Sequence, residues 1–264
     1  MAGNETEETM DYKLLLDTAV LAGKLMLASG AEIYRVEDTV ERILATSGLK
    51  TREAYVTSTG FIVTLDDPKF DSMTVVRRVP SRVIDLNVIT IVNTISREFC
   101  AGEIDLKTAF HRLKHMDARQ YRSWQKELAT IGVVTMFTVV FGGSVQDLCA
   151  AAAVGGLLVL MERLGRRFSL NAFLQTMLSA AVIAIGAICI SSIKPLQVNM
   201  DTVIISAIMP IVPGAALTTA IRDILQGDYV SGGAKALEAL VKAAAIVLGV
   251  GAGMMAMGGL HLWT

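Results

Sequence analysis

Five apolar runs fill the second half of the chain, and they restrict the fold more than any other feature. They lie at about residues 129–143, 146–163, 172–193, 202–222 and 235–258. An α-helix rises ~1.5 Å per residue, so about 20 apolar residues are needed to cross the ~30 Å hydrocarbon core of a bilayer. The runs therefore predict five transmembrane helices, of which the first is short.

The charged residues are concentrated before these runs. Residues 1–127 hold 17 of the 24 Lys and Arg and 19 of the 25 Asp and Glu. This contrast predicts a soluble domain at residues 1–127 and a five-helix transmembrane domain at residues 128–264. The formal net charge is −1, which gives no electrostatic basis for binding nucleic acid.

The first half has the pattern of an α+β domain. Apolar residues at three- and four-residue spacing predict helices at 11–47 (broken at Ser29 and Gly30), 84–99 and 104–115. Residues rich in β-branched and aromatic side chains predict one strand at 53–65, with Gly60 as a point of bending, and a second at 72–79. The predicted fold class is thus an α-helical membrane protein preceded by a cytoplasmic α+β domain.

Lys and Arg beside the apolar runs predict the orientation. Basic residues precede the first run and lie between the second and third runs and between the fourth and fifth. The opposite side has only Lys194. The acidic N-terminus also lacks the basic and apolar regions of a signal peptide. We therefore expect the first domain in the cytoplasm and the C-terminus outside.

The fourth run is interrupted by Pro210 and Pro213 near its middle. Each proline lacks an N–H and displaces the carbonyl four residues earlier, those of Ser206 and Met209. A helix that restarts at Pro213 would present free amides from Gly214 onward at the positive end of its dipole, which suits a carboxylate. The alternative is a proline kink satisfied by neighbouring helices. The predicted substrate-binding residues are Pro210, Pro213, Gly214, Thr218, Thr219 and Asp223.

Ionisable residues inside membrane spans are costly and therefore functional candidates. Asp147, at the outer end of the second run, is a candidate gate or proton carrier, or is simply hydrated. Asp228, like Asp223, follows the fourth run and could cap a helix or bind ions at a cytoplasmic mouth. Glu162 with Arg166, and Glu238 with Lys242, are spaced four residues apart and are better explained as helix ion pairs.

Glu32, Arg35 and Glu37 crowd one helix of the first domain and are candidates for gating or coupling. A solvated helix face is the alternative. His111 and His115 lack the glutamate of an HExxH zinc motif. No ATP-binding or nucleophile motif is present, so we predict no metal, cofactor or catalytic residue.

Small residues recur at four-residue spacing in the fifth run, at Ala245, Gly249 and Gly253. Such residues let helix backbones approach closely in a membrane. The pattern indicates tight packing within the bundle or, alternatively, an interface with a second copy or a partner.

Two segments resemble the threonine/serine exporter family: SGAEIYRVEDTVERIL at 29–44 and PGAALTTAIRDILQGDYVSGGAKALEA at 213–239. The resemblance extends from about Asp11 to Gly259. The family pattern of the first segment matches Gly30, Glu32, Arg35 and Glu37. That of the second matches Pro213, Gly214, Asp223, Gly227, Asp228, Ser231 and Gly232.

Long members of this family join such a half to a second membrane half, whereas short members are split into two polypeptides. This chain resembles the larger subunit of a split exporter, similar to the pair implicated in bacterial succinate export. The resemblance implies secondary active export of threonine and serine, or of a dicarboxylate such as succinate, across the bacterial inner membrane. It implies a smaller membrane subunit as partner; a homo-oligomer is a further possibility. The alternatives are a membrane-anchored regulatory or enzymatic cytoplasmic domain, or a scaffold.

Overall fold

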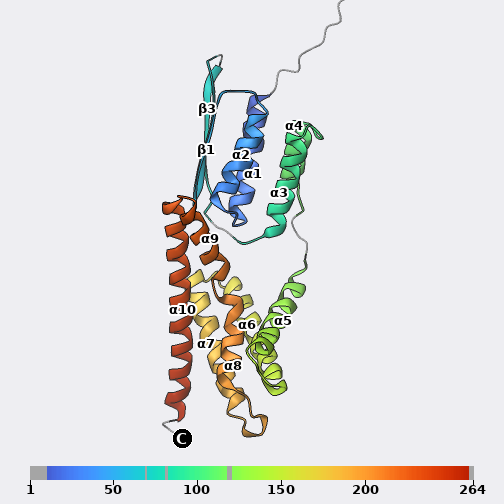
Figure 1. Ribbon diagram of the computed structural model, residues 1–264. Coiled ribbons are helices and arrows are strands. Elements are labelled where there is room, and N and C mark those ends of the chain that lie inside the picture. The colour runs from blue at the N-terminus through green and yellow to red at the C-terminus, as the bar shows by residue number, and fades with distance from the viewer. Residues whose placement is uncertain (1–10, 69, 81–82, 118–120, 262–264) are drawn as a thin grey trace, which may run out of the picture. The chain divides into compact units, whose positions relative to one another are not determined.

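The computed structural model describes residues 11–68, 70–80, 83–117 and 121–261 (Figure 1). The chain divides into two compact units. The N-terminal unit comprises residues 1–120 and 218–235, and the helical unit comprises residues 121–217 and 236–264. A segment from late in the chain thus belongs to the unit that the first half builds. The predicted division into a cytoplasmic and a transmembrane domain at residue 127 stays a prediction.

The described residues form helices and three strands, which bear the labels of Figure 1. In chain order they are α1 (Tyr12–Ala28), α2 (Ile33–Ala45), β1 (Thr51–Thr57), β2 (Gly60–Asp67), β3 (Phe70–Arg78), α3 (Leu86–Cys100), α4 (Leu106–Lys114), α5 (Ser123–Val140), α6 (Val145–Arg167), α7 (Ala172–Ser191), the 3-10 turn η1 (Lys194–Leu196), α8 (Met200–Ile208), the 3-10 turn η2 (Met209–Ile211), α9 (Gly214–Leu225) and α10 (Tyr229–His261).

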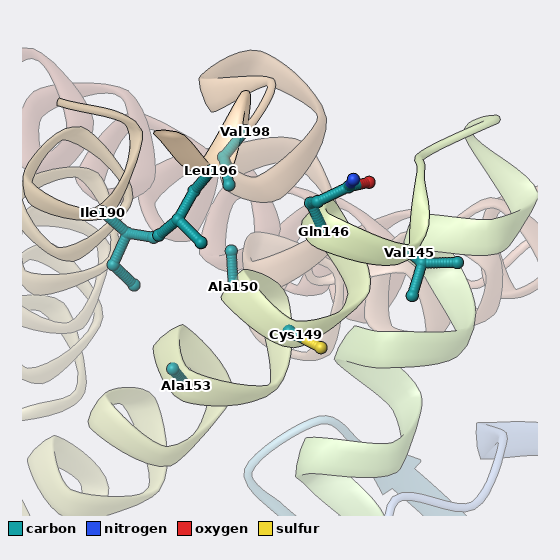
Figure 2. A pocket seen from close by; sticks show the side chains of 8 residues that line it. All are labelled: Val145, Gln146, Cys149, Ala150, Ala153, Ile190, Leu196 and Val198. Carbon is teal, nitrogen blue, oxygen red and sulfur yellow. The ribbon is translucent and has the colours of Figure 1, made fainter. Parts of the chain in front are cut away.

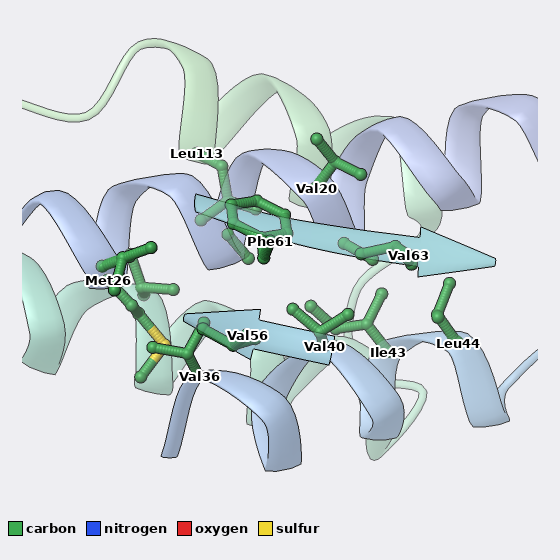
Figure 3. Close-up of a cluster of buried hydrophobic side chains, with 14 of the residues drawn as sticks. Val20, Met26, Val36, Val40, Ile43, Leu44, Val56, Phe61, Val63 and Leu113 are labelled. Carbon is green, nitrogen blue, oxygen red and sulfur yellow. The ribbon is translucent and has the colours of Figure 1, made fainter. Parts of the chain in front are cut away.

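In the N-terminal unit, helices cover one face of an antiparallel sheet with the order β1-β2-β3. Alternate residues of β2, Phe61, Val63 and Leu65, are buried because successive side chains of a strand point to opposite faces. Figure 3 shows Val36 and Val40 of α2 beside these strands, in one core with Met26 of α1 and Leu113 of α4. The predicted helices and α+β class of this half are thus present.

The prediction of one strand over residues 53–65 is wrong. The chain turns at Ser58 and Thr59, and Thr57 pairs with Gly60, so the segment is a hairpin. The glycine is needed because a Cβ there would lie 2.5 Å from the carbonyl oxygen of Arg77 on β3. Gly60 therefore allows a close backbone approach at the first residue of β2, where the sequence suggested a bend.

The helical unit packs α5, α6, α7 and α8 around a core that includes Val134, Val154, Leu158 and Ile183. Small residues of α10 pack closely against α7 in this unit. A Cβ at Gly249 would overlap the carbonyl oxygen of Met177 on α7, and one at Gly253 would lie 2.7 Å from that of Ala181. The ladder is thus a helix–helix contact inside this unit, as the packing interpretation predicts.

Three helices among the described residues, α6, α7 and α10, are long and apolar enough to cross a membrane. The segments Met200–Ile211 and Gly214–Leu225 pass the same test together as a pair bent by 53°. Counted as one span, this pair raises the number of candidate membrane spans among the described residues to four. Helix α5 is not among them, since its first turns contain Gln125, Lys126 and Glu127. A fifth transmembrane helix stays a prediction.

The break between α8 and α9 falls at the two prolines, but its polar groups are satisfied locally. The carbonyl of Ser206 accepts from the Met209 amide, and that of Met209 accepts from the Val212 amide at 3.3 Å. The Gly214 amide donates to the Val212 carbonyl at 2.8 Å. The expectation of a free amide at Gly214 is therefore wrong, because a tight turn precedes α9 and uses this donor.

Candidate functional site

Charged side chains from three helices of the N-terminal unit meet where α9 turns into α10. We call this group the ionic cluster. Its members come from the start of α2, the end of α9, the turn after it and the start of α10: Glu32, Glu37, Arg222, Asp223, Asp228 and Lys235. All six lie within residues 1–120 and 218–235.

Asp223 is the centre of the cluster and is fully buried. Its Oδ2 accepts from the Lys235 ammonium at 2.6 Å, and the Lys235 side chain is only 8% exposed. Its Oδ1 accepts from the backbone amide of Ile33 at 3.4 Å. Helix α2 has Glu32 at its N-cap, with no side-chain cap hydrogen bond of its own. Asp223 thus supplies the missing cap from a distant part of the chain, at the positive end of the helix dipole.

Glu32 pairs with Arg222 through its Oε1. Its second oxygen, Oε2, is buried and has no hydrogen-bond partner in the part of the chain that the structure describes. Burial, and then the neighbouring Glu32 carboxylate, raise the pKa of the Tyr34 hydroxyl. A buried carboxylate oxygen without a donor is costly, so this position favours a nearby cationic group.

Two carboxyls of the cluster have pKa values above their ordinary ones. Glu37 accepts from the Val56 amide at 3.0 Å, yet burial raises the pKa of its carboxyl, with added repulsion from Asp228 and Glu41. Burial and the Asp223 carboxylate raise the pKa of Asp228, against the opposing effect of Lys235. The cluster thus combines a fixed ion pair with two carboxyls that take up protons more readily than usual.

Backbone geometry holds α9 and α10 close together beside these groups. Gly227, with φ +98°, forms the turn between them. A Cβ at Gly232 would lie 2.8 Å from the Ala220 carbonyl oxygen and 2.9 Å from the Ile224 nitrogen. The hydroxyl of Ser231 accepts from the Ser58 amide at 3.2 Å, which links α10 to the β1–β2 turn.

The structure brings together only part of the predicted site. Glu32, Glu37, Asp223 and Asp228 belong to the cluster. The Arg35 side chain is exposed on α2 and makes no hydrogen bond or ion pair with any described residue. Thr218 and Thr219 lie on α9, with Thr219 one turn before Asp223. Pro210, Pro213 and Gly214 belong to the helical unit and form the break.

Asp147 is not a member of the ionic cluster and belongs to the helical unit. Its Oδ2 accepts from the Ser144 amide at 2.8 Å, in a capping box that begins α6. Its Oδ1 accepts from the Asn199 amide at 2.6 Å, just before α8. Both carboxylate oxygens are therefore engaged in a cap that joins two helices, and a role for Asp147 as a gate or proton carrier stays a prediction.

A cavity of about 360 Å³ in the helical unit lies between α6, α7 and the segment before α8 (Figure 2). Cys149, Ala150 and Ala153 of α6 face Ile190, Leu196 and Val198, and Gln146 lies at its edge. Its lining contains no charged side chain. This cavity therefore lacks the groups that would hold a carboxylate or an ammonium group.

In the sequence, Arg222 and Lys235 stood out only as the basic residues between the fourth and fifth apolar runs. The signal that would have found the ion pair is the spacing of Asp223 and Lys235 on either side of Gly227. A glycine turn between two helices brings such residues together, provided that the helices pack antiparallel. Nothing in the sequence indicates the contact of Ser231 with Ser58.

The apolar helices, the bent pair and the charged cluster define the class as a helical membrane protein. Within this class, the chain belongs to the family described as "Putative threonine/serine exporter", whose match covers residues 17–257. The resemblance of the two segments quoted above is thereby confirmed. A relative from Mycobacterium tuberculosis, named "Probable threonine/serine exporter", is 22% identical over 252 residues. The match covers 92% of this chain but only 46% of the relative. No solved structure matches.

Proposed function

We propose that the chain is one part of a secondary exporter of threonine and serine, a multi-pass protein of the bacterial inner membrane. The family and the name of the relative support amino acids as the substrate class. Succinate or a similar dicarboxylate is the alternative substrate, from the resemblance to a split exporter. The proposed orientation has the N-terminus in the cytoplasm and the C-terminus outside, from the distribution of Lys and Arg.

The observation that carries the proposal is the buried pair of Asp223 and Lys235. Asp223 lies on α9, the second half of the bent pair, and also caps α2. A buried ion pair is weak evidence of stability but favours one arrangement of the elements that it joins. We assign to the ionic cluster the coupling of proton uptake to movement of α9. Substrate binding is assigned to the break at Pro210, Pro213 and Gly214, with Thr218 and Thr219.

Proton uptake would act through the cluster's excess of carboxyls. Four carboxyls and two cations give the cluster an excess of two negative charges when all are ionised. A proton on Glu37 or Asp228 would remove repulsion and leave the pair of Asp223 and Lys235 intact. Export in exchange for protons would then alternate between two charge states of one cluster.

A second membrane subunit completes the proposal. The chain spans 46% of the length of the relative. The resemblance to a split exporter supports a second polypeptide as the source of the other membrane half. In many transporters two repeats enclose a site near the middle of the membrane. A homo-oligomer in which a second copy fills this role is the competing arrangement.

The test is efflux from vesicles that contain the chain with and without a co-expressed small membrane subunit. Vesicles are preloaded with labelled threonine, serine or succinate. We expect threonine and serine to leave only when both polypeptides are present. Retention of both amino acids in every preparation would refute the proposed substrates, and efflux of succinate alone would replace them. Efflux by the purified chain without a partner would exclude the two-subunit arrangement.

A further inference from the structure

The N-terminal unit contains a second charged feature, away from the ionic cluster. A groove of about 260 Å³ lies between α1, β3 and α4. Its apolar floor is formed by Val20 and Leu21 of α1. Lys24 of α1, Arg77 of β3 and Lys114 of α4 line it, together with Asp17 and Phe110. We call this hollow the basic groove.

The basic groove gathers cations that have no anionic partner among the described residues. Among the described residues, Lys24, Arg77 and Lys114 form no ion pair or hydrogen bond through their side chains, and neither does Asp17. Three cations and one carboxylate leave an excess of two positive charges around one small hollow. Like charges placed together repel, and an anion bound between them would relieve this cost.

The direction of the Arg77 side chain supports a ligand bound between α1, β3 and α4. Met73 and Val75 of β3 pack on the helix-covered core, so alternation puts Arg77 on the same face and Arg78 on the other. An inward-pointing charge on an edge strand can also serve to prevent sheet extension. That role would explain Arg77 alone. It does not explain Lys24 and Lys114, which reach the same hollow from two helices.

The chemistry of the lining defines the class of ligand. A guanidinium binds a phosphate or carboxylate group through two parallel hydrogen bonds, and lysines add charge. Phe110 is half-buried and lies under the Lys114 ammonium, 5.7 Å from its ring centre, so it offers an apolar surface beside the charges. The volume suits a small metabolite rather than a large cofactor.

We infer that the basic groove is a binding site for a small, doubly negative organic anion, carrying a phosphate or two carboxylates. Such a site lies within residues 1–120 and is separate from the ionic cluster. It would let the concentration of an anionic metabolite act on the unit that contains the ionic cluster. The inference does not depend on the identity of the transported substrate.

The test is calorimetric titration of the detergent-solubilised full chain with inorganic phosphate, adenosine monophosphate and succinate. We expect at least one of the three to bind, with an affinity that falls as salt is added. Binding of all phosphate compounds would indicate a simple phosphate site, and binding of adenosine monophosphate alone a site for a phosphorylated metabolite. Binding of succinate would indicate a dicarboxylate site. If none binds, the inference is wrong.

Matched variants locate the binding. Arg77→Gln and Lys114→Gln should each weaken it about tenfold, as expected for loss of one charge-assisted contact. The controls are Arg78→Gln, on the opposite face of β3, and Lys107→Gln, an exposed residue of the same helix α4. Equal affinities in all four variants would place the anion elsewhere and overturn the inference. Thermal unfolding without ligand verifies that each variant is folded.

Discussion

At the scale of single residues, Asp223 joins three parts of the N-terminal unit. It caps α2, pairs with Lys235 on α10 and is itself part of α9. Each of its two oxygens has a donor, so removal of either partner leaves a buried acceptor without compensation. This residue therefore connects the cap of one helix to the packing of two others.

Replacement of Lys235 by methionine tests this pair. We expect Lys235→Met to lower stability by about 3–5 kcal/mol, because Asp223 would keep a buried charge without its partner. The double variant Asp223→Asn with Lys235→Met should recover much of that loss, since asparagine retains an acceptor for the Ile33 amide. Thermal unfolding of the solubilised chain measures both.

The matched control is Lys242→Met, on the same helix. Lys242 pairs with Glu238 at 3.0 Å, with side chains 31% and 51% exposed. Such a pair contributes about 0.3–0.5 kcal/mol. Equal losses for the variants at 235 and 242 would contradict the role given to the buried pair.

Glu37 provides a prediction about pH. Its pKa is raised above the ordinary value of 4.5, so the folded chain holds this proton at higher pH than the unfolded chain does. The stability contributed by the proton is complete below pH 4.5 and is lost as pH rises through the raised pKa. Glu37→Gln keeps an acceptor for the Val56 amide and removes the charge.

The variant Glu37→Gln should therefore be more stable than the parent at neutral pH, and the difference should shrink in acid. Melting temperatures measured from about pH 4 to about pH 8 follow this change. Glu53→Gln, at an exposed position of β1, is the control and should leave the profile unchanged. Parallel profiles for Glu37→Gln and the parent would show that Glu37 does not titrate as described.

Sequence patterns predicted some of these residues but not their contacts. Glu32 and Glu37 were candidates because charged residues crowd one helix, and Asp223 and Asp228 because they follow the fourth apolar run. The residues that meet are about 190 positions apart along the chain, as in the hydrogen bond from the Ile33 amide to Asp223. No periodicity records such a long-range contact. The hydrogen bond between Asp147 and the Asn199 amide was not predictable for the same reason, because the two residues are 52 positions apart.

At the scale of elements, the corner between α9 and α10 depends on glycine. Gly232→Ala should destabilise the chain by about 1–3 kcal/mol, because the new methyl group would collide with backbone atoms of Ala220 and Ile224. Gly233→Ala is the control, since no heavy atom lies within 4 Å of its added Cβ. Chemical or thermal unfolding compares the two, and a Gly232 variant as stable as the Gly233 variant would argue against close packing.

The break in the bent pair gives a prediction about transport. Pro213→Ala with Gly214→Leu should abolish efflux and preserve membrane insertion. The leucine begins in open space, because no heavy atom lies within 4 Å of a Cβ at Gly214. Loss of efflux would therefore report the altered break rather than a collision. Efflux from vesicles, with insertion checked by membrane fractionation, is the measurement; unchanged efflux would remove the break from the substrate path.

Elements with strong periodicity were predictable, and those set by close contacts were not. The break at Pro210 and Pro213 followed from the lack of two N–H groups, and helices α1 to α4 followed from their apolar spacing. The hairpin turn at Ser58 and Thr59 was missed because both flanking strands contain many β-branched residues. In addition, the turn has no proline or asparagine to mark it. The donor role of Gly214 was missed because it depends on the conformation of the turn before it.

At the scale of the whole molecule, the chain is a family member that spans less than half of its relative. The family supports transport, and the two units divide the candidate residues between them. We assign coupling to the ionic cluster and substrate binding to the break between α8 and α9. A variant that stays folded but lacks the cluster's central charges would separate these roles.

The most direct measurement is efflux of labelled threonine from vesicles that contain the chain together with the co-expressed small subunit. The parent and the double variant Asp223→Asn with Lys235→Met are compared at equal amounts of inserted protein and with the same proton gradient. We expect efflux by the parent and none by the double variant. Equal efflux by the two would contradict the role of the ionic cluster, and no efflux by either would contradict threonine export itself.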